Sequence, residues 1–220
     1  MAKKLFVVWL LISMIIFSSI TIYANQEKPA EAQVIKKSRT QAEPTEIVTA
    51  MAETETAVRK EDEGYLEGLS AYIRHVNRNV SEEEADSMVR SFVEYAEQYD
   101  VDEKIVMAVA QNESTYYAGA VSSADFKGLM QTGDGLARNA GYDPGQLFEP
   151  SVSIKVGARY LSMKFDEFGD MRLALTAYNQ GSGSVYSGNY TTGYADLALE
   201  RADAMEDFLV NNGYIEKPIS

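Results

Sequence analysis

The sequence predicts a mainly α-helical domain, and three observations point to that fold class. Apolar residues recur at intervals of three and four over six segments between Tyr65 and Asn211, which is the spacing of a helix that buries one face. Two of these segments begin at side chains that often cap helix N-termini, Ser81 and Asp102. No strand has comparable support in the pattern.

Composition limits the classes of function. The chain has 220 residues, of which 45% are hydrophobic and 24% charged, as expected for one globular domain with additional segments. It has no cysteine, which excludes a disulfide framework and a thiolate metal site, and its single histidine, His75, makes a histidine zinc site or a Ser-His-Asp triad improbable. We therefore expect no metal and no cofactor. A formal net charge of −13 argues against nucleic acid as a partner.

The N-terminus carries a candidate membrane segment. Residues 5–23 contain no charge and follow Lys3 and Lys4, and this length suffices for a helix to cross a bilayer. The sequence Ile22-Tyr23-Ala24 is a poor cleavage signal. We expect residues 1–24 to be a retained single-pass anchor with the N-terminus in the cytoplasm and the remainder exported, the alternative being a cleaved signal sequence and a secreted protein.

Residues 25–63 predict a disordered polar linker. They are dominated by Ala, Glu, Thr, Lys and Gln, include Pro29 and Pro44, and contain little apolar material. Such a composition buries too little surface to offset chain entropy. We expect it to hold the following domain, residues 64–220, away from the membrane.

The first two helices of that domain differ in the strength of their pattern. Residues 65–76 have a weak helical pattern and predict an outer helix, in which we expect His75 to be a surface or hydrogen-bonded histidine and not a catalytic one. A clearer helix begins after Ser81, which forms a capping box with Glu84. Its predicted inward residues are Ala85, Met88, Val89, Phe92, Val93, Ala96 and Tyr99.

The next helix, which begins at an Asp102 cap, carries the candidate catalytic residue. Glu113 closes an apolar stripe near the end of this helix. Aliphatic neighbours and the negative end of the helix dipole both disfavour a charged carboxylate there. Glu113 is therefore a candidate general acid that stays protonated near neutral pH. The alternative is a surface glutamate in the last turn of an ordinary helix.

The rest of the domain is predicted as loops followed by three helices. Residues 116–143 are rich in Gly, Ser and Asp and predict loops and short helical turns, where binding residues often lie. A long helix follows Pro150, with Ser151 or Ser153 near its start, and ends at Gly169. Its predicted inward residues are Ile154, Gly157, Ala158, Leu161, Phe165 and Phe168. A short helix over 173–178 stops at Asn179-Gln180-Gly181, and residues 194–211 form the last helix, with Leu197, Ala198, Met205, Phe208 and Leu209 inward.

Several motifs occur in an order that resembles a known family. They are Glu113-Ser114, GLMQ at 128–131, GYDP at 141–144, LFEP at 147–150 and AYNQG at 177–181. From about Asn79 to Leu199 the sequence resembles the catalytic domain of the soluble lytic transglycosylases, the peptidoglycan-cleaving relatives of goose-type lysozyme. The resemblance implies a lysozyme-like helical domain that acts on peptidoglycan glycan strands. No pattern indicates a protein partner.

The resemblance also implies roles for individual residues. Glu113 matches the family's catalytic acid and base. Six residues match positions that contact the sugar or the acid: Ser114, Met130, Gln131, Tyr178, Asn179 and Tyr194. Core packing remains the alternative for Met130, a helix C-cap is the alternative for Asn179, and Tyr190 is a weaker candidate for the role of Tyr194.

In the chemistry that this family implies, the N-acetyl group of muramic acid supports the cationic centre and the sugar's C6 hydroxyl attacks it, giving a 1,6-anhydro product. Two alternatives remain open. The first is a hydrolytic muramidase in which Asp134, or less readily Asp125, positions a water. The second is a glycan-binding module without activity. The chain departs from the family pattern at 122–126 and 131–134, which affects the expected path of the loop beside the cleft.

Overall fold

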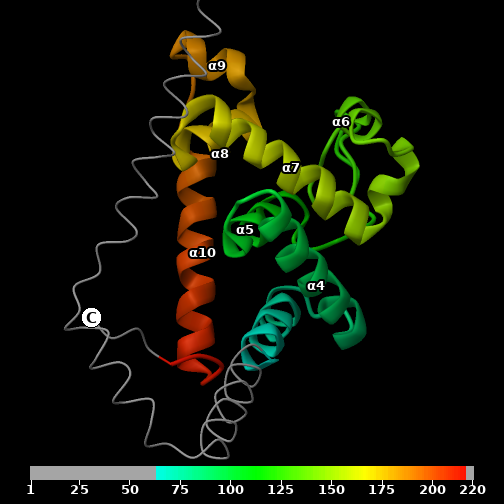
Figure 1. The fold of residues 1–220 in the computed structure, drawn as a ribbon, viewed down its shortest axis with the longest axis vertical. Coiled ribbons are helices and arrows are strands. Elements are labelled where there is room, and N and C mark those ends of the chain that lie inside the picture. Colours follow the sequence, from blue (N-terminus) through cyan, green and yellow to red (C-terminus); the bar gives the residue numbers. More distant parts are fainter. Residues whose placement is uncertain (1–62, 217–220) are drawn as a thin grey trace, which may run out of the picture. The chain divides into compact units, whose positions relative to one another are not determined.

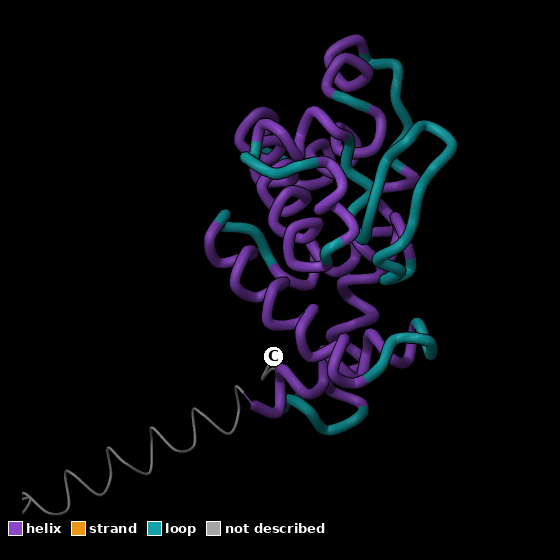
Figure 2. Tube along the Cα trace, turned by 90° about the vertical axis from the view of Figure 1, so that its right-hand side faces the viewer, coloured by secondary structure: helices purple, strands orange, loops and turns teal. Residues whose placement is uncertain are grey.

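The computed structural model describes residues 63–216, which form the helical domain (Figure 1). The predicted membrane segment and almost all of the predicted linker lie outside the described residues. Figure 2 shows helices joined by loops, with no strand among the residues described; two isolated bridges pair Lys127 with Val121 and Thr132. No described helix is both long and apolar enough to span a membrane. The predicted mainly α class is confirmed.

The domain begins with two helices that were both predicted. Residues 63–76 are helical, and Leu69, Tyr72 and Ile73 are buried. A Cβ built on Gly68 would lie 2.4 Å from Leu209 Cδ2, so this helix packs closely on the last helix of the domain. Helix α4, Glu82–Gln98, begins with the predicted capping box. His75 is exposed, as expected.

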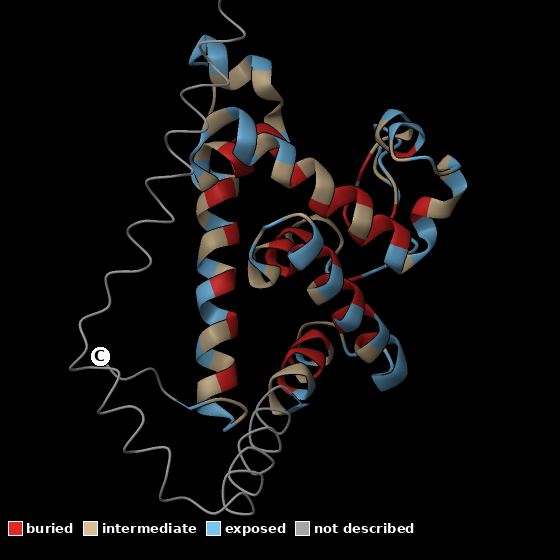
Figure 3. Cartoon of the chain, in the orientation of Figure 1, coloured by how far each residue is buried: buried red, intermediate tan, exposed pale blue. Residues whose placement is uncertain are grey.

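Helix α5, Glu103–Ser114, lies at the centre of the core. The Asp102 carboxylate accepts hydrogen bonds from two backbone N–H groups of its first turn, which confirms the predicted cap. Residues 106–110 are all fully buried, because α4, α7 and α10 pack around this helix. Figure 3 shows the buried faces of the surrounding helices turned toward α5.

The second half of the domain contains α6, Asp134–Asn139; a 3-10 turn η1, Pro144–Phe148; α7, Pro150–Phe168; α8, Met171–Gln180; α9, Ser182–Ser187; and α10, Gly193–Asn211. The loops and short turns predicted over 116–143 are confirmed. Helix α7 begins at Pro150, one position before Ser151 and three before Ser153, because proline suits the first helical position. Helix α9 was not predicted, since its six residues are too few to show a period.

Three details of the predicted helices were wrong. Phe165 and Leu197, expected to face inward, are 38% and 41% exposed. Phe165 lies near the end of α7, beyond Leu161, the last buried residue of that helix. Helix α8 runs through Asn179 and Gln180, and Gly181 is its C-cap with φ of 81°. A left-handed backbone favours glycine, so Asn179 is not a cap.

Candidate active site

Glu113 is the second-last residue of α5 and is partly buried. The helix ends immediately after it because Thr115 and Tyr116 both adopt positive φ, 52° and 59°. These conformations are unfavourable outside glycine. They are held by burial of the Tyr116 ring against Phe92, with 6.3 Å between centroids, and by a 2.9 Å hydrogen bond that Asn77 donates to the carbonyl of Thr115. The end of α5 is therefore fixed in place.

The carboxyl group of Glu113 meets the hydroxyl of Tyr194 from α10. Tyr194 donates a hydrogen bond of 2.6 Å to Glu113 Oε1. Burial raises the pKa of Glu113, and the hydrogen bond from Tyr194 partly opposes this by stabilising the charged form. Burial and the nearby Glu113 also raise the pKa of the Tyr194 hydroxyl, which keeps it a donor. The raised pKa of Glu113 agrees with the direction expected from the sequence.

A second pair of contacts, which sequence reasoning missed, holds α5 against α10 behind this carboxyl group. Asn112 donates to the backbone carbonyl of Tyr194 at 3.4 Å. Arg201 in turn donates to Asn112 Oδ1. Both contacts join Asn112, the residue before Glu113, to the helix that carries Tyr194. They therefore hold the side chains of Glu113 and Tyr194 close to each other.

The GLMQ segment is fixed against α5 and α7. Ser114 donates to the carbonyl of Leu129 at 2.8 Å, and the backbone N–H of Met130 donates to Ser153 Oγ at 3.1 Å. Gly128 has φ of 74°, and a Cβ on it would lie 1.8 Å from the carbonyl oxygen of Leu147. Only glycine fits this position. In this structure the hydroxyl of Ser114 holds the backbone of the GLMQ segment through its hydrogen bond to Leu129.

Met130 lies in the core and not on the surface of a cleft. Its side chain is fully buried, and a Cβ on Gly157 would lie 2.6 Å from Met130 Cβ. The prediction that the Met130 side chain contacts a sugar is therefore wrong. The alternative, that Met130 packs in the core, agrees with its burial. The reason is that glycine at 157 lets α7 approach closely enough to cover Met130.

Tyr178 and Gln131 both brace this loop. The Tyr178 hydroxyl donates to the carbonyl of Met130 at 2.9 Å. The Gln131 amide donates to the carbonyls of Ala120 and Gly128 at 3.1 Å and 3.0 Å. Each uses its hydrogen-bond donors on backbone oxygens, while Asn179 is exposed.

These elements enclose a pocket of about 360 Å³, which we call the Glu113 pocket. That volume is in the range of small-molecule sites. Its lining comprises Glu113, Phe126, Gln131, Thr132, Gly133, Leu136, Tyr160, Tyr178, Asn179, Gln180 and Gly181. The structure thus brings four of the predicted site residues to one pocket. Ser114, Met130 and Tyr194 are not among its lining residues, and Tyr190 makes no hydrogen bond to Glu113.

Several lining residues were not predicted as site residues, and Tyr160 shows why. It lies on α7 beside the predicted inward face, and its ring is 5.1 Å from that of Tyr178. A helical pattern alone does not distinguish an aromatic residue at the edge of a core from one at the edge of a pocket. Phe126 and Thr132 were noted only as departures from the family pattern.

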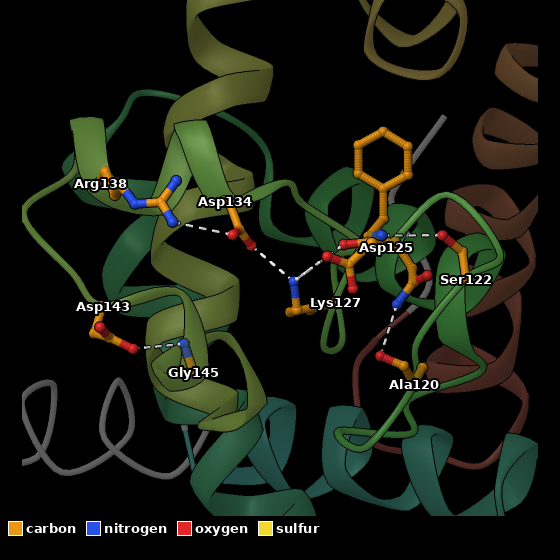
Figure 4. Close-up of polar contacts among 10 residues, drawn as sticks. Ala120, Ser122, Asp125, Lys127, Asp134, Arg138, Asp143 and Gly145 are labelled. Atoms are coloured by element: carbon orange, nitrogen blue, oxygen red, sulfur yellow. Dashed lines mark hydrogen bonds and ion pairs between the residues drawn. The ribbon is translucent and has the colours of Figure 1, made fainter.

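The alternative carboxylates are paired with cations and are not among the residues that line the pocket. Asp134 pairs with Lys127 at 2.7 Å and with Arg138 at 3.1 Å, and Asp125 pairs with Lys127 at 2.9 Å (Figure 4). The hydrogen bond from Lys127 is the main reason that the pKa of Asp134 is lowered. Neither aspartate lines the Glu113 pocket. Within residues 63–216 no cluster of three or more acidic or histidine side chains is placed to hold a metal ion.

Comparison with known proteins agrees with this architecture. The chain is similar in structure to the 70 kDa soluble lytic transglycosylase of Escherichia coli, with a TM-score of 0.53 and 23% identity over 64% of this chain and 30% of that one. This similarity defines the fold class, a helical, lysozyme-like domain.

Sequence similarity indicates the same class of protein. Residues 90–196 match the transglycosylase SLT domain. The soluble lytic murein transglycosylase of Salmonella typhimurium is 35% identical over 43% of this chain and 16% of its own length. The membrane-bound lytic murein transglycosylase C of Klebsiella pneumoniae is 38% identical over 40% of this chain and 29% of its own length. The chain therefore spans less than a third of the length of these relatives, and the similarity to the transglycosylase SLT domain covers its residues 90–196.

Proposed function

We propose that this protein is a peptidoglycan lytic transglycosylase that cleaves the bond between N-acetylmuramic acid and N-acetylglucosamine, with Glu113 as its general acid and base. The observation that carries the proposal is the position of Glu113: a partly buried carboxyl group with a raised pKa, hydrogen-bonded to Tyr194, on the wall of a pocket. The names of the related proteins support the same substrate class.

The raised pKa suits the first step. Protonated Glu113 donates its proton to the leaving glycosidic oxygen as the bond from the muramic acid C1 to that oxygen breaks. The N-acetyl group stabilises the cationic centre. The C6 hydroxyl oxygen then bonds to C1 and gives its proton to the Glu113 carboxylate, which restores the acid. One carboxyl group serves both steps, and no water is consumed.

The surrounding residues support binding and positioning. Asn179, Tyr178 and Gln131 line the pocket, and the exposed amide of Asn179 is free to meet polar sugar substituents. Ser114 positions the backbone that follows Gly128. Tyr194 orients the acid and limits how far its pKa rises.

Hydrolysis is the second candidate, and the position of Asp134 disfavours it. A hydrolase of the goose-lysozyme type requires a group that positions water near the sugar, whereas Asp134 is paired with two cations and lies outside the pocket lining. A transglycosylase requires no second carboxylate.

Product analysis in water labelled with heavy oxygen tests the reaction. Purified peptidoglycan is digested, and the released fragments are measured by mass spectrometry. Transglycosylation predicts anhydromuramic ends without label. Reducing muramic ends that carry the label would establish hydrolysis instead, and absence of any released fragment would support a binding module.

We further propose that residues 1–24 anchor the protein, with the catalytic domain on the wall side of the membrane. The support is the uncharged run over 5–23 and its poor cleavage signal. Fractionation tests this: the full-length chain should remain with membranes, and protease added outside protoplasts should release the domain. Recovery of a mature chain that begins near Asn25 in the medium would contradict the anchor.

A further inference from the structure

A second pocket adjoins the Glu113 pocket along α7. It has a volume of about 310 Å³, and Leu136 and Tyr160 line both pockets. We call it the side pocket. The two pockets therefore adjoin at these residues, and a substituent of a ligand bound in the first lies close to the second.

Arg159 is the charged group of the side pocket. It is partly buried on α7, next to Tyr160 in the chain, and the pocket lining contains no acidic residue. One of its nitrogens donates to the backbone carbonyl of Asn139, the last residue of α6, at 3.0 Å. A guanidinium carries five N–H donors, so most of its donors remain available to a ligand.

Arg159 forms no ion pair within residues 63–216. The chain has 33 acidic residues against 20 lysines and arginines, and Arg74, Arg138 and Arg172 each form an ion pair. No carboxylate of residues 63–216 lies within 4 Å of a nitrogen of Arg159. A partly buried guanidinium in an acidic protein is thus left to pair with a group from outside.

The chemistry of the pocket indicates that group. A planar guanidinium fork matches a carboxylate through two parallel hydrogen bonds. Met163, which is 49% exposed, and the Tyr160 ring supply apolar surface beside it. An anionic substituent on a partly apolar carrier fits this combination better than a plain neutral sugar.

We propose that the side pocket is a subsite for a carboxylate-bearing substituent of the glycan, with Arg159 as the residue that binds the carboxylate. This inference rests on the proposed function and specifies which part of the substrate the side pocket binds. Muramic acid carries a lactyl ether whose carboxyl group is either free or extended by a peptide that itself bears carboxylates. Both sources present the same chemistry to Arg159.

Calorimetric titration of the full-length chain carrying Glu113→Gln tests the subsite without consuming the ligand. Three probes are used: a neutral N-acetylglucosamine tetramer, a muramic-acid glycan with free lactyl groups, and the same glycan with stem peptides. At least one carboxylate probe should bind more tightly than the tetramer. Adding Arg159→Gln should weaken that probe about tenfold, the value of one charge-assisted contact, and leave the tetramer unchanged. The probe that loses affinity identifies the source of the carboxylate.

Two further variants separate binding from structure. Arg159→Lys keeps the charge without the fork and should lose part of the affinity. Arg90→Gln removes one charge from an exposed position on α4 and should change nothing. Equal weakening of all probes by Arg159→Gln would show a structural role only and overturn the subsite, as would tetramer binding with no gain from a carboxylate. Failure of every glycan to bind would contradict the proposed function as well.

Discussion

The hydroxyl of Tyr194 lies 2.6 Å from Glu113 Oε1, although 81 residues separate them in the chain. Tyr194→Phe removes this donor, which stabilises the charged carboxylate. The pKa of Glu113 should rise further, so the alkaline limb of the kcat/KM profile should move to higher pH. The rate should fall about tenfold, since hydrogen bonds to charged groups contribute about 1.5–3 kcal/mol.

Tyr190→Phe is the matched control, because it removes a hydroxyl that makes no contact with Glu113. Its pH profile should match that of the parent. A Tyr194→Phe profile that also matches the parent would contradict the role of this hydrogen bond.

Stability against pH provides a test of the buried carboxyl group. Because the pKa of Glu113 is higher in the folded than in the unfolded chain, the folded chain binds more protons between those two values. The contribution of Glu113 to stability therefore falls as pH rises through that window. Glu113→Gln lacks this loss, so its melting temperature should exceed that of the parent near pH 7, with the difference shrinking toward pH 4. A difference independent of pH would contradict the raised pKa.

Gly128→Ala tests the close approach of the GLMQ segment to the backbone. The new methyl group would lie 1.8 Å from the Leu147 carbonyl oxygen, at a φ of 74°. We expect a loss of more than about 3 kcal/mol in the free energy of unfolding, measured in urea. Gly141→Ala, with φ of 86° but no atom within 4 Å, should lose only about 1–2 kcal/mol from backbone strain. Equal losses would show that strain alone matters at Gly128.

Thr132 offers a stabilising substitution beside the pocket. It is 1% exposed, and its hydroxyl has no partner among the described residues. Thr132→Val keeps the shape and removes an unsatisfied group, so unfolding should require about 1 kcal/mol more. Thr176→Val removes a buried hydroxyl that donates to the Arg172 carbonyl at 2.8 Å and should gain nothing. A loss of stability in Thr132→Val would show that the Thr132 hydroxyl makes a stabilising hydrogen bond, and would contradict its description as an unsatisfied group.

The helices that the sequence predicted best are those whose signals are local. The Ser81 capping box, the Asp102 cap and the final stop at Gly169 all depend on neighbouring residues, and each occurs in the structure. The exposed positions of Phe165, near the end of α7, and Leu197, near the start of α10, were missed, because burial near either end of a helix depends on which element passes beside it.

The candidate site was predictable in part for the same reason. Glu113 closes an apolar stripe that is visible in the sequence, and the family resemblance pointed to Tyr194. The burial of Met130, which lies in a turn, follows from the approach of Gly157, 27 residues later on α7. Arg159 forms no ion pair among the described residues because folding brings no carboxylate of residues 63–216 near it. Neither fact has a local signature.

The most direct test of the account is the activity of Glu113→Gln beside that of Glu94→Gln, which changes an exposed glutamate on α4. Clearance of purified peptidoglycan is measured together with thermal unfolding. Because glutamine cannot donate or accept the reacting proton, the Glu113 variant should remain folded and lose at least about a hundredfold in rate, while the Glu94 variant keeps the parent rate. A folded Glu113→Gln protein that clears peptidoglycan at the parent rate would contradict the catalytic role of Glu113.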